Sequence, residues 1–285
     1  MNDASEQRLT IAKRNAITYL VNSKVKAIGV AGSVARGQAD AYSDIDMSLY
    51  YEELPSPEEL KAAYKQNQGS DYRVYANERE SGAIVEQYFV QGIRCDFGHV
   101  TIERFERDIG MLLEQCDPDN LLLKVLEGTV DMLALHGTEL INKWKGKGAN
   151  YPDELAQAMV KKHLNFRPLW ILQNYGVERG DVLFFFEEIL IATKNIIGVL
   201  SGLNRFYHPV NPAPFKGMDR LIEKMMIAPH NLSSRLKELF RVSPHSAVHQ
   251  LGELIEETFT LVETHMPEVD TTEEKKRYTL WSDKF

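Results

Sequence analysis

The sequence predicts an α+β fold, in which a small mixed sheet with helices on one side is followed by an all-helical bundle. Three observations support this prediction. Short apolar segments separated by turn residues recur over roughly the first 100 positions, which is typical of strands. Two of these segments are joined through Gln91-Gly92, the mark of a tight hairpin. Beyond Cys116 the apolar residues recur with a helical period. We therefore expect two domains, residues 1–115 and 116–285.

The first domain is expected to begin with one helix and two strands. Residues 6–22 carry apolar side chains at helical spacing, so they predict an amphipathic helix. Residues 24–31 form a short apolar segment that ends in a Gly-Ser turn, and residues 44–51 form a second one. Both segments predict strands.

A helix and a hairpin are expected to complete the first domain. Pro57 opens the helix, and Glu58 and Glu59 follow in its first turn, where acidic groups suit the helix dipole. Residues 83–90 and 93–100 then predict two antiparallel strands.

The second domain is expected to consist of helices interrupted by a proline-rich insert at residues 208–214. The helices that the apolar periodicity predicts are Leu121–Leu135, Asp153–Leu172, Asp181–Leu200, Met218–Met226, Ser233–Arg241 and Ala247–Thr264.

Composition narrows the class of protein. The 285 residues carry a net charge of −8, so we expect no nucleic-acid partner, because nucleic-acid binding depends on neutralising phosphates with Lys and Arg. The two cysteines, Cys95 and Cys116, do not form a disulfide framework, and we interpret them as reduced cytoplasmic thiols. No apolar run approaches the roughly 18 residues of a membrane span, and the polar N-terminus is not typical of a signal peptide.

The segment from Ala31 to Asp46 carries the strongest chemical signal. Asp44 and Asp46 flank one isoleucine, and side chains two apart on a strand project from the same face. Two neighbouring carboxylates repel each other unless a cation lies between them. The Gly32-Ser33 turn can offer N–H groups and a hydroxyl to an anion. A divalent metal beside a phosphate site is the arrangement used for metal-assisted phosphoryl chemistry.

Gly32-Ser33, Gly37 and Ser43-Asp44-Ile45-Asp46 together resemble the signature of the DNA polymerase β-type nucleotidyltransferase superfamily. The resemblance covers roughly the first 100 residues. The helical remainder resembles, more weakly, the C-terminal domains of aminoglycoside and lincosamide nucleotidyltransferases. The resemblance implies two Mg²⁺ ions held by three carboxylates, of which two are Asp44 and Asp46.

The third carboxylate implied by the resemblance comes from a neighbouring strand, and Asp96 is the best match. Arg94 is expected on the same strand face, so a salt bridge without a metal is the alternative interpretation of Asp96. The resemblance also implies that Ser33 and Arg36 hold the triphosphate of ATP or another nucleoside triphosphate. Ser33 could also serve as a helix N-cap, and Arg36 could be a solvated surface charge.

The helical domain offers two weaker candidates. Glu187 and Glu188 lie in a polar stripe on an otherwise apolar predicted helix. Either could take the proton of an acceptor hydroxyl, and Glu188 is the preferred candidate, although a solvated stripe explains both residues at least as well. Lys216 follows the proline-rich insert, near Arg205 and Tyr207. Lys216 could contact phosphates and Tyr207 could stack on a base, or the cluster could simply pack on the bundle.

These observations predict a cytoplasmic enzyme that transfers a nucleoside monophosphate to a hydroxyl of a small molecule, for which an antibiotic is the suggested class. We expect the active site between the two domains. Two other hypotheses stay open: nucleotidylation of a protein partner, as in a regulatory or toxin–antitoxin pair, and a catalytically silent nucleotide-binding regulator. The sequence does not indicate the oligomeric state.

Overall fold

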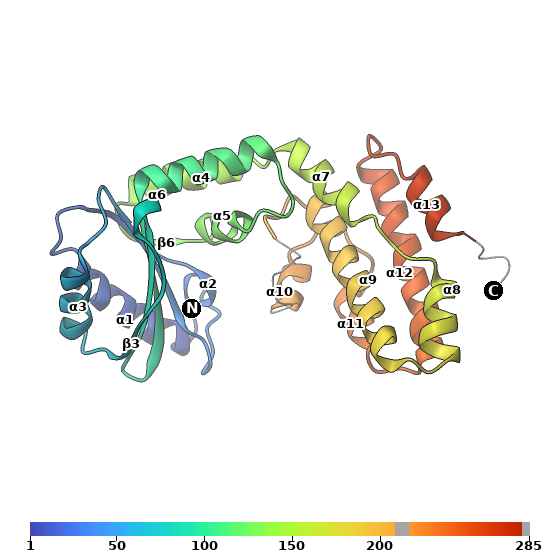
Figure 1. Cartoon of the computed structure of the whole chain (residues 1–285), viewed down its shortest axis with the longest axis horizontal. Coiled ribbons are helices and arrows are strands. Elements are labelled where there is room, and N and C mark those ends of the chain that lie inside the picture. Colours follow the sequence, from blue (N-terminus) through green and yellow to red (C-terminus); the bar gives the residue numbers. More distant parts are fainter. Residues whose placement is uncertain (209–216, 281–285) are drawn as a thin grey trace. The chain divides into compact units, whose positions relative to one another are not determined.

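The computed structural model describes residues 1–208 and 217–280. The chain divides into two compact units. Met1–Glu114 and Lys124–Asn150 form the first, which we call the sheet unit, and Gln115–Leu123 and Tyr151–Phe285 form the second, which we call the helical unit. A sheet-containing part followed by a helical part confirms the α+β prediction (Figure 1).

The sheet unit is built on six strands in the order β3-β4-β5-β2-β1-β6. Strands β2 and β5 run parallel, and every other neighbouring pair is antiparallel. The strands are β1 (Val25–Val30), β2 (Ile45–Tyr51), β3 (Ser70–Glu78), β4 (Ala83–Val90), β5 (Ile93–Thr101) and β6 (Leu133–His136). The predicted β1, β2 and β4–β5 hairpin are all present.

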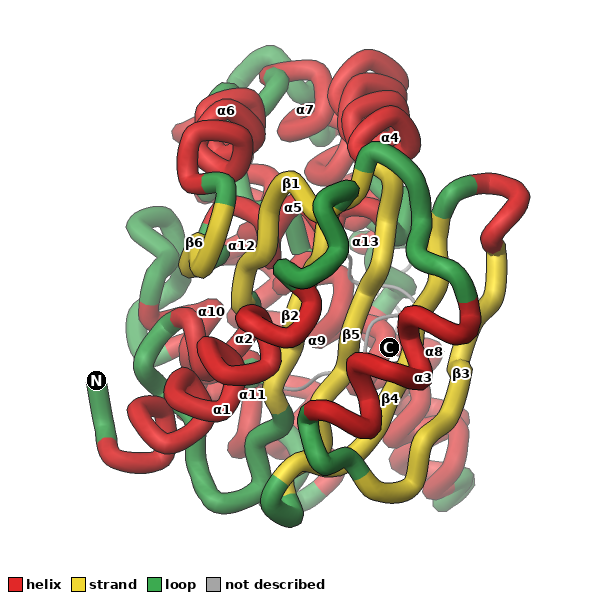
Figure 2. Tube along the Cα trace, turned by 90° about the vertical axis from the view of Figure 1, so that its left-hand side faces the viewer, coloured by secondary structure: helices red, strands yellow, loops and turns green. Residues whose placement is uncertain are grey.

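Helices α1 (Asp3–Tyr19) and α3 (Pro57–Gln66) lie on one side of this sheet (Figure 2). Alternate residues of β2 are buried among apolar side chains: Ile45, Met47, Leu49 and Tyr51. Helix α3 begins with a reciprocal cap, because the Ser56 hydroxyl accepts from the Glu59 backbone N–H and the Glu59 carboxylate accepts from the Ser56 N–H.

A buried polar network ties α1 to the sheet on that same side. The Glu86 carboxylate has no exposure to solvent, and its Oε1 accepts from the Tyr19 hydroxyl at 2.5 Å. The same oxygen lies 3.0 Å from His99 Nε2, and His99 Nδ1 lies 2.9 Å from the Tyr51 hydroxyl. Buried polar groups of this kind need partners, so the network fixes the relative placement of α1, β2, β4 and β5.

The other side of the sheet is covered at one end by α4 (Ile102–Gln115), α5 (Leu122–Val130) and α6 (Thr138–Ala149) (Figure 1). Tyr50 projects from β2 into this layer and packs against Phe105 and Trp144, with ring centroids 4.7 and 4.5 Å apart. Asp46 lies four positions earlier on β2, an even spacing that places it on this same face.

Strand β6 corrects the predicted helix over residues 121–135. Helix α5 ends at Val130, and Leu133–His136 pairs with β1 instead. The leucines and alanine of this segment favour helix locally, but pairing with an exposed strand edge overrides that preference. Because β6 pairs with β1 and α6 follows it, the sheet unit includes residues up to Asn150. The sequence predicts the domain boundary earlier, at residue 115.

The helical unit has its core between α7 (Asp153–His163), α9 (Val182–Leu203) and α12 (Pro244–His265). Gly198 of α9 makes the close approach of α7 possible, because a Cβ at this position would overlap the His163 ring. The remaining short helices of this unit are α8 (Leu169–Ile171), a π-helical turn at Leu172–Glu178, α10 (Met218–Glu223), α11 (Leu232–Glu238) and α13 (Thr272–Tyr278).

The predicted helix over residues 153–172 is interrupted. Helix α7 ends at His163, and residues 164–168 have no regular secondary structure before the chain becomes helical again at Leu169. Pro168 accounts for the break, because a proline disfavours helical geometry in the residue before it. None of the helices in the described ranges is long and apolar enough to cross a membrane.

Candidate active site

The register of the sheet brings three aspartates together on the face opposite α1 and α3. Asp46 of β2 is the direct neighbour of Asp96 on the parallel strand β5, and Asp44 immediately precedes β2. One carboxylate oxygen from each residue lies within 4.8 Å of the others. All three side chains are partly buried.

Arg94 lies among these carboxylates. Its guanidinium forms an ion pair with Asp44, and its Nε lies 3.3 Å from Asp96 Oδ1. The salt bridge that the sequence offered as an alternative for Asp96 is therefore present, within the same cluster as the other two aspartates. Gln87 of β4 pairs with Asp96 across the hairpin.

Burial raises the pKa of Asp96 above the usual range of an aspartate. The positive charge of Arg94 lowers this pKa, and so does a hydrogen bond with Gln87, whereas charge repulsion from Asp44 raises it further. A raised pKa marks a carboxylate whose negative charge is not fully compensated by its surroundings. An added cation would supply that compensation.

The donor set fits a hard divalent cation. The cluster offers carboxylate oxygens only, which are the ligands that Mg²⁺ prefers, and Mg²⁺ keeps several waters, so a few carboxylates together with a substrate phosphate suffice. Asp96 Oδ1 is buried, and apart from its ion pair with Arg94 it accepts no hydrogen bond from any described residue. The cluster therefore has both the chemistry and the spare acceptor capacity of a magnesium site.

Gly32 brings the preceding turn against the cluster. Its φ is +67°, a conformation that costs glycine little and other residues more. A Cβ at this position would overlap Asp46 Oδ2, so two independent constraints favour glycine here. Gly37 also has a positive φ, +69°, and its N–H donates to the Val34 carbonyl at 3.0 Å, which closes the turn.

Ser33 lies in the short helix α2 (Gly32–Ala35), and Arg36 directly follows this helix. The interpretation of Ser33 as an N-cap is wrong, because Ala31 occupies the cap position and no side chain caps the helix. Arg36 is not simply solvated, since its NH1 lies 3.6 Å from Asp131 Oδ2. Asp131 follows α5, and the sequence does not predict its contact with Arg36 because no local pattern links two residues so far apart in the chain.

Residues 14–107 match the family model described as a nucleotidyltransferase domain. This part of the chain is a nucleotidyltransferase domain. The matched span includes the β1–α2 turn, the Asp-x-Asp strand and Asp96, so the chain is assigned to the nucleotidyltransferase class of enzymes, and the resemblance in the sequence is confirmed.

One solved structure that the chain resembles is a nucleotidyltransferase-like protein from Exiguobacterium sibiricum. The two chains share 12% sequence identity, the match covers 91% of this chain and 80% of the other, and the TM-score is 0.38. No curated protein matches the chain.

Glu188 belongs to the helical unit, whereas the three aspartates belong to the nucleotidyltransferase domain. A solvated stripe is the wrong interpretation of this residue, because Glu188 is only 7% exposed. Its Oε2 lies 3.3 Å from Arg167 Nε. Burial raises the pKa of Glu188, Arg167 opposes this change, and Glu187 adds to it. That Glu188 takes the proton of the acceptor hydroxyl in the reaction at the aspartates stays a prediction.

The second cluster that the sequence analysis singled out packs within the helical unit. Tyr207 is buried and lies 4.5 Å from Tyr151, centroid to centroid, and Arg205 NH2 lies 2.5 Å from Asp153 Oδ1. These contacts favour the packing interpretation over base stacking. Lys216 lies outside the described residues, and its proposed phosphate contact stays a prediction.

Proposed function

We propose that this nucleotidyltransferase transfers a nucleoside monophosphate from ATP, or another nucleoside triphosphate, to a hydroxyl of a small molecule in a Mg²⁺-dependent reaction. The observation that carries the proposal is the cluster of Asp44, Asp46 and Asp96 beside the Gly32 turn. The family match over the same residues supports it.

In this reaction the acceptor oxygen forms a bond to the α-phosphorus as the bond from that phosphorus to the β-phosphate oxygen breaks, and pyrophosphate leaves. Two Mg²⁺ ions, when bound, offset the charge that develops on the attacking and leaving oxygens. Asp44 and Asp46 would hold both ions, and Asp96 would complete the set on the attacking side.

The chain's own groups would also bind the triphosphate. Arg36 would exchange its Asp131 partner, 3.6 Å away, for phosphate oxygens, which a guanidinium binds through two parallel hydrogen bonds. The Ser33 hydroxyl would donate a further hydrogen bond. Gly32 and Gly37 would let the backbone turn approach the phosphates closely, as glycines do in other phosphate-binding loops.

Glu188 of the helical unit is the candidate for the group that takes the proton of the acceptor hydroxyl. Burial raises the pKa of Glu188, which makes its carboxylate a stronger base, and the Arg167 contact would have to break before it accepts a proton. Lys216 is the corresponding candidate for a phosphate contact. An antibiotic as acceptor rests on the resemblance alone.

The test is release of pyrophosphate from each of the four nucleoside triphosphates, with Mg²⁺, against a panel of hydroxyl-bearing small molecules. We expect one nucleotide and one acceptor class to give metal-dependent release that Asp46→Asn abolishes. Nucleotide binding without release from any acceptor would instead favour the catalytically silent regulator. Absence of nucleotide binding would overturn the proposal.

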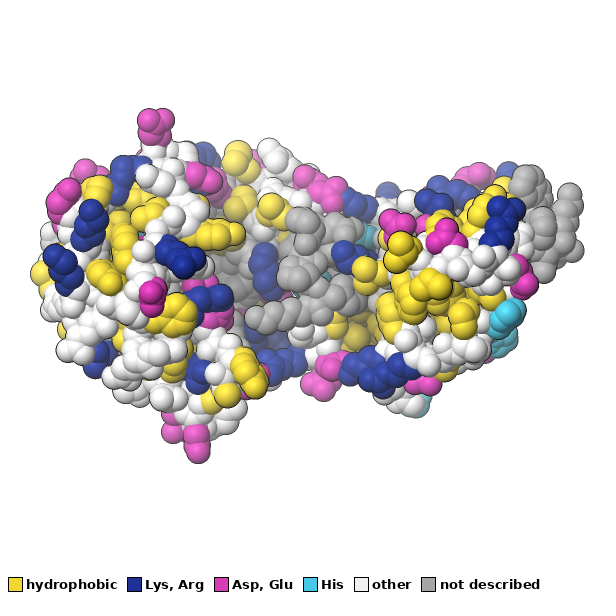
Figure 3. All heavy atoms as spheres, turned by 60° about the horizontal axis from the view of Figure 1, so that its bottom comes forward, with side chains coloured by type: hydrophobic (Ala, Val, Ile, Leu, Met, Phe, Trp, Pro, Cys, Tyr) yellow, Lys and Arg dark blue, Asp and Glu magenta, His cyan; other side chains and the backbone are white. Residues whose placement is uncertain are grey.

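Transfer to a protein side chain is the second candidate, and one observation favours it. Exposed apolar side chains gather on a face of the helical unit (Figure 3), and the first half of α9 contributes several, including Leu183 at 84% exposure and Val182 at 59%. Apolar surface of this kind often marks a protein-binding face. Intact-mass spectrometry of proteins incubated with the enzyme and ATP separates the two candidates, because only protein transfer adds the mass of a nucleotide to a polypeptide.

A further inference from the structure

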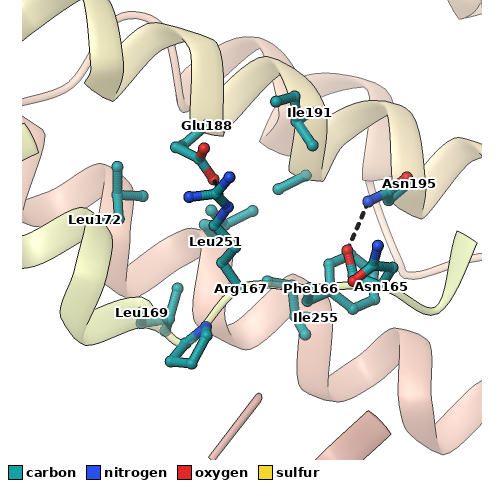
Figure 4. Close-up of a pocket in the computed structure, with 12 residues that line it drawn as sticks. Asn165, Phe166, Arg167, Leu169, Leu172, Glu188, Ile191, Asn195, Leu251 and Ile255 are labelled. Carbon is teal, nitrogen blue, oxygen red and sulfur yellow. Dashed lines mark hydrogen bonds and ion pairs between the residues drawn. The ribbon is translucent and has the colours of Figure 1, made fainter. Parts of the chain in front are cut away.

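The helical unit contains a cavity that the proposed reaction does not explain. Its volume is about 180 Å³, and it lies between residues 165–169, helix α9 and helix α12 (Figure 4). Eight of its twelve lining residues are apolar, and four of these side chains are almost fully buried: Phe166, Leu172, Leu251 and Ile255. Two charged side chains, Arg167 and Glu188, face each other at one end (Figure 4).

These two charged groups differ in their exposure to solvent. The Glu188 side chain is 8% exposed, whereas that of Arg167 is 61% exposed. Their 3.3 Å ion pair is the only ionic contact of either residue that the structure describes within residues 1–208 and 217–280. Glu188 is therefore a largely buried acidic group in the cavity wall, and Arg167 is a solvent-exposed cation at the rim.

A ligand with a single charge would suit this end poorly. An ammonium group placed on Glu188 would meet the positive charge of Arg167, and a carboxylate placed on Arg167 would meet the negative charge of Glu188. A ligand that carries both groups a few ångströms apart satisfies both residues at once. Burial of the ligand's apolar part against Leu172, Leu251 and Ile255 would add the hydrophobic contribution.

We propose that this cavity binds a small zwitterion, namely an α-amino acid with an apolar side chain. Its ammonium group is held by Glu188 and its carboxylate by Arg167. Its side chain fills the apolar part of the cavity.

The size of the cavity supports this class of ligand. A cavity of about 150 Å³ accommodates benzene, so 180 Å³ accommodates a branched aliphatic or phenyl side chain. Sites for drug-sized ligands run from about 300 to 1,000 Å³. The cavity is therefore too small for a nucleotide or an oligosaccharide antibiotic, which separates it from the substrates of the proposed reaction.

The cavity walls are held in place without a ligand. Asn195 of α9 donates through Nδ2 to the Asn165 carbonyl at 2.7 Å (Figure 4), and its Oδ1 lies 3.2 Å from His163 Nδ1. The extended segment ahead of Pro168 is thereby tied to α9. Leu172, at the other end, begins the π-helical turn, a rare geometry that recurs at functional sites. A preformed wall reduces the ordering that binding requires.

The inference concerns binding in the absence of nucleotide, so it can be tested separately from the proposed nucleotidyl transfer. It gives Glu188 a binding role in place of the proton-accepting role. Zwitterion binding could fail while pyrophosphate release persists, or the reverse, so the two failures are distinguishable.

The experiment is calorimetric titration of the full chain with L-phenylalanine and L-leucine, without nucleotide. Three analogues each remove one feature: phenethylamine lacks the carboxylate, 3-phenylpropionate lacks the ammonium group, and glycine lacks the apolar side chain. We expect one or both amino acids to bind with a Kd of about 1 mM or tighter, and each analogue to bind at least about tenfold more weakly, the equivalent of one lost charged contact.

Glu188→Gln and Arg167→Gln are each expected to weaken binding by a similar factor. Glu187→Gln and Arg241→Gln are matched controls, because both residues are exposed and lie outside the cavity lining. Arg167 is itself largely exposed, so its variant tests the proposal even if Glu188→Gln unfolds. Failure of both amino acids to bind, equal binding of phenethylamine, or binding unaffected by Arg167→Gln would each overturn the proposal.

Discussion

The sheet unit and the helical unit hold their acidic side chains in opposite ways. Three aspartates of like charge meet on a sheet face, within 4.8 Å of one another, and Arg94 forms ion pairs with two of them, Asp44 and Asp96. In the helical unit one glutamate lies among apolar side chains, facing one arginine 3.3 Å away. Excess negative charge favours a divalent cation, whereas a balanced pair in an apolar cavity favours an organic zwitterion.

The two units also position these groups by different means. In the sheet unit, the alternation of side chains and the register between β2 and β5 place Asp46 beside Asp96. In the helical unit, close helix packing and a proline break form the cavity around Glu188. The following predictions test each side of this contrast, in order of decreasing effect.

Asp46→Asn is expected to have the largest effect. Removing one negative charge from the cluster is expected to lower its affinity for the metal ion. The bound metal stabilises the charge of the transition state by several kcal/mol, so losing that stabilisation lowers the catalytic rate by about 10³-fold. Pyrophosphate release and Mn²⁺ titration measure the two effects. Asp71→Asn, at an exposed position in β3, is the control. Undiminished Mn²⁺ affinity in Asp46→Asn would show that the cluster is not a metal site.

Gly198→Ala tests the close packing of the helical unit. The added methyl would overlap His163, so we expect a loss of about 1–3 kcal/mol in the free energy of unfolding. Gly110→Ala, on α4 of the sheet unit, meets no atom within 4 Å and should stabilise by about 0.5–1 kcal/mol. Urea denaturation measures both. Equal effects of the two variants would contradict the account of how α7 and α9 pack.

Tyr19→Phe tests the polar network beneath the active-site strands. The variant removes the 2.5 Å hydrogen bond to Glu86, and we expect it to lose about 1 kcal/mol of stability. Tyr42→Phe is the matched control, because Tyr42 is 97% exposed. Thermal unfolding of both variants gives the comparison. An unchanged Tm in Tyr19→Phe would show that the hydrogen bond between Tyr19 and Glu86 does not stabilise the fold.

Asp96→Asn is expected to raise the stability of the metal-free protein slightly. The pKa of Asp96 is raised in the folded state, so its ionised form is less favourable folded than unfolded, and the difference applies at pH values above the folded pKa. The gain in Tm should be present at pH 7 and disappear as the pH falls below about 4, where the residue is protonated in both states.

Thermal unfolding of Asp96→Asn across that pH range, with a chelator present, measures the effect. A loss of stability at pH 7 would show instead that the Arg94 ion pair outweighs the cost of burying the carboxylate. The same substitution should reduce Mn²⁺ affinity, so stability and metal binding are expected to change in opposite directions.

The sequence predicted those parts of the fold and site that depend on neighbours along the chain. Asp44 and Asp46 share a face because they are two residues apart, and the β4–β5 hairpin follows from its turn. Strand β3 was missed because its side chains are mostly exposed and show no clean alternation. Strand β6 was missed because only its pairing with β1 makes it a strand.

Contacts between distant residues explain the rest. The contact between Arg36 and Asp131 depends on where α5 ends, and the pairing of Glu188 with Arg167 depends on a break in a predicted helix. Periodicity identified Glu188 as a polar residue on an apolar helix. It could not show that the residue is buried against a cavity.

Calorimetric titration with ATP, in the presence and absence of Mg²⁺, tests the central claim most directly. The wild-type chain should bind ATP in a metal-dependent manner, and the double variant Asp44→Asn/Asp46→Asn should lose that dependence while remaining folded. Equal binding by the two proteins, or binding indifferent to Mg²⁺, would contradict the assignment of the aspartate cluster as the metal and nucleotide site.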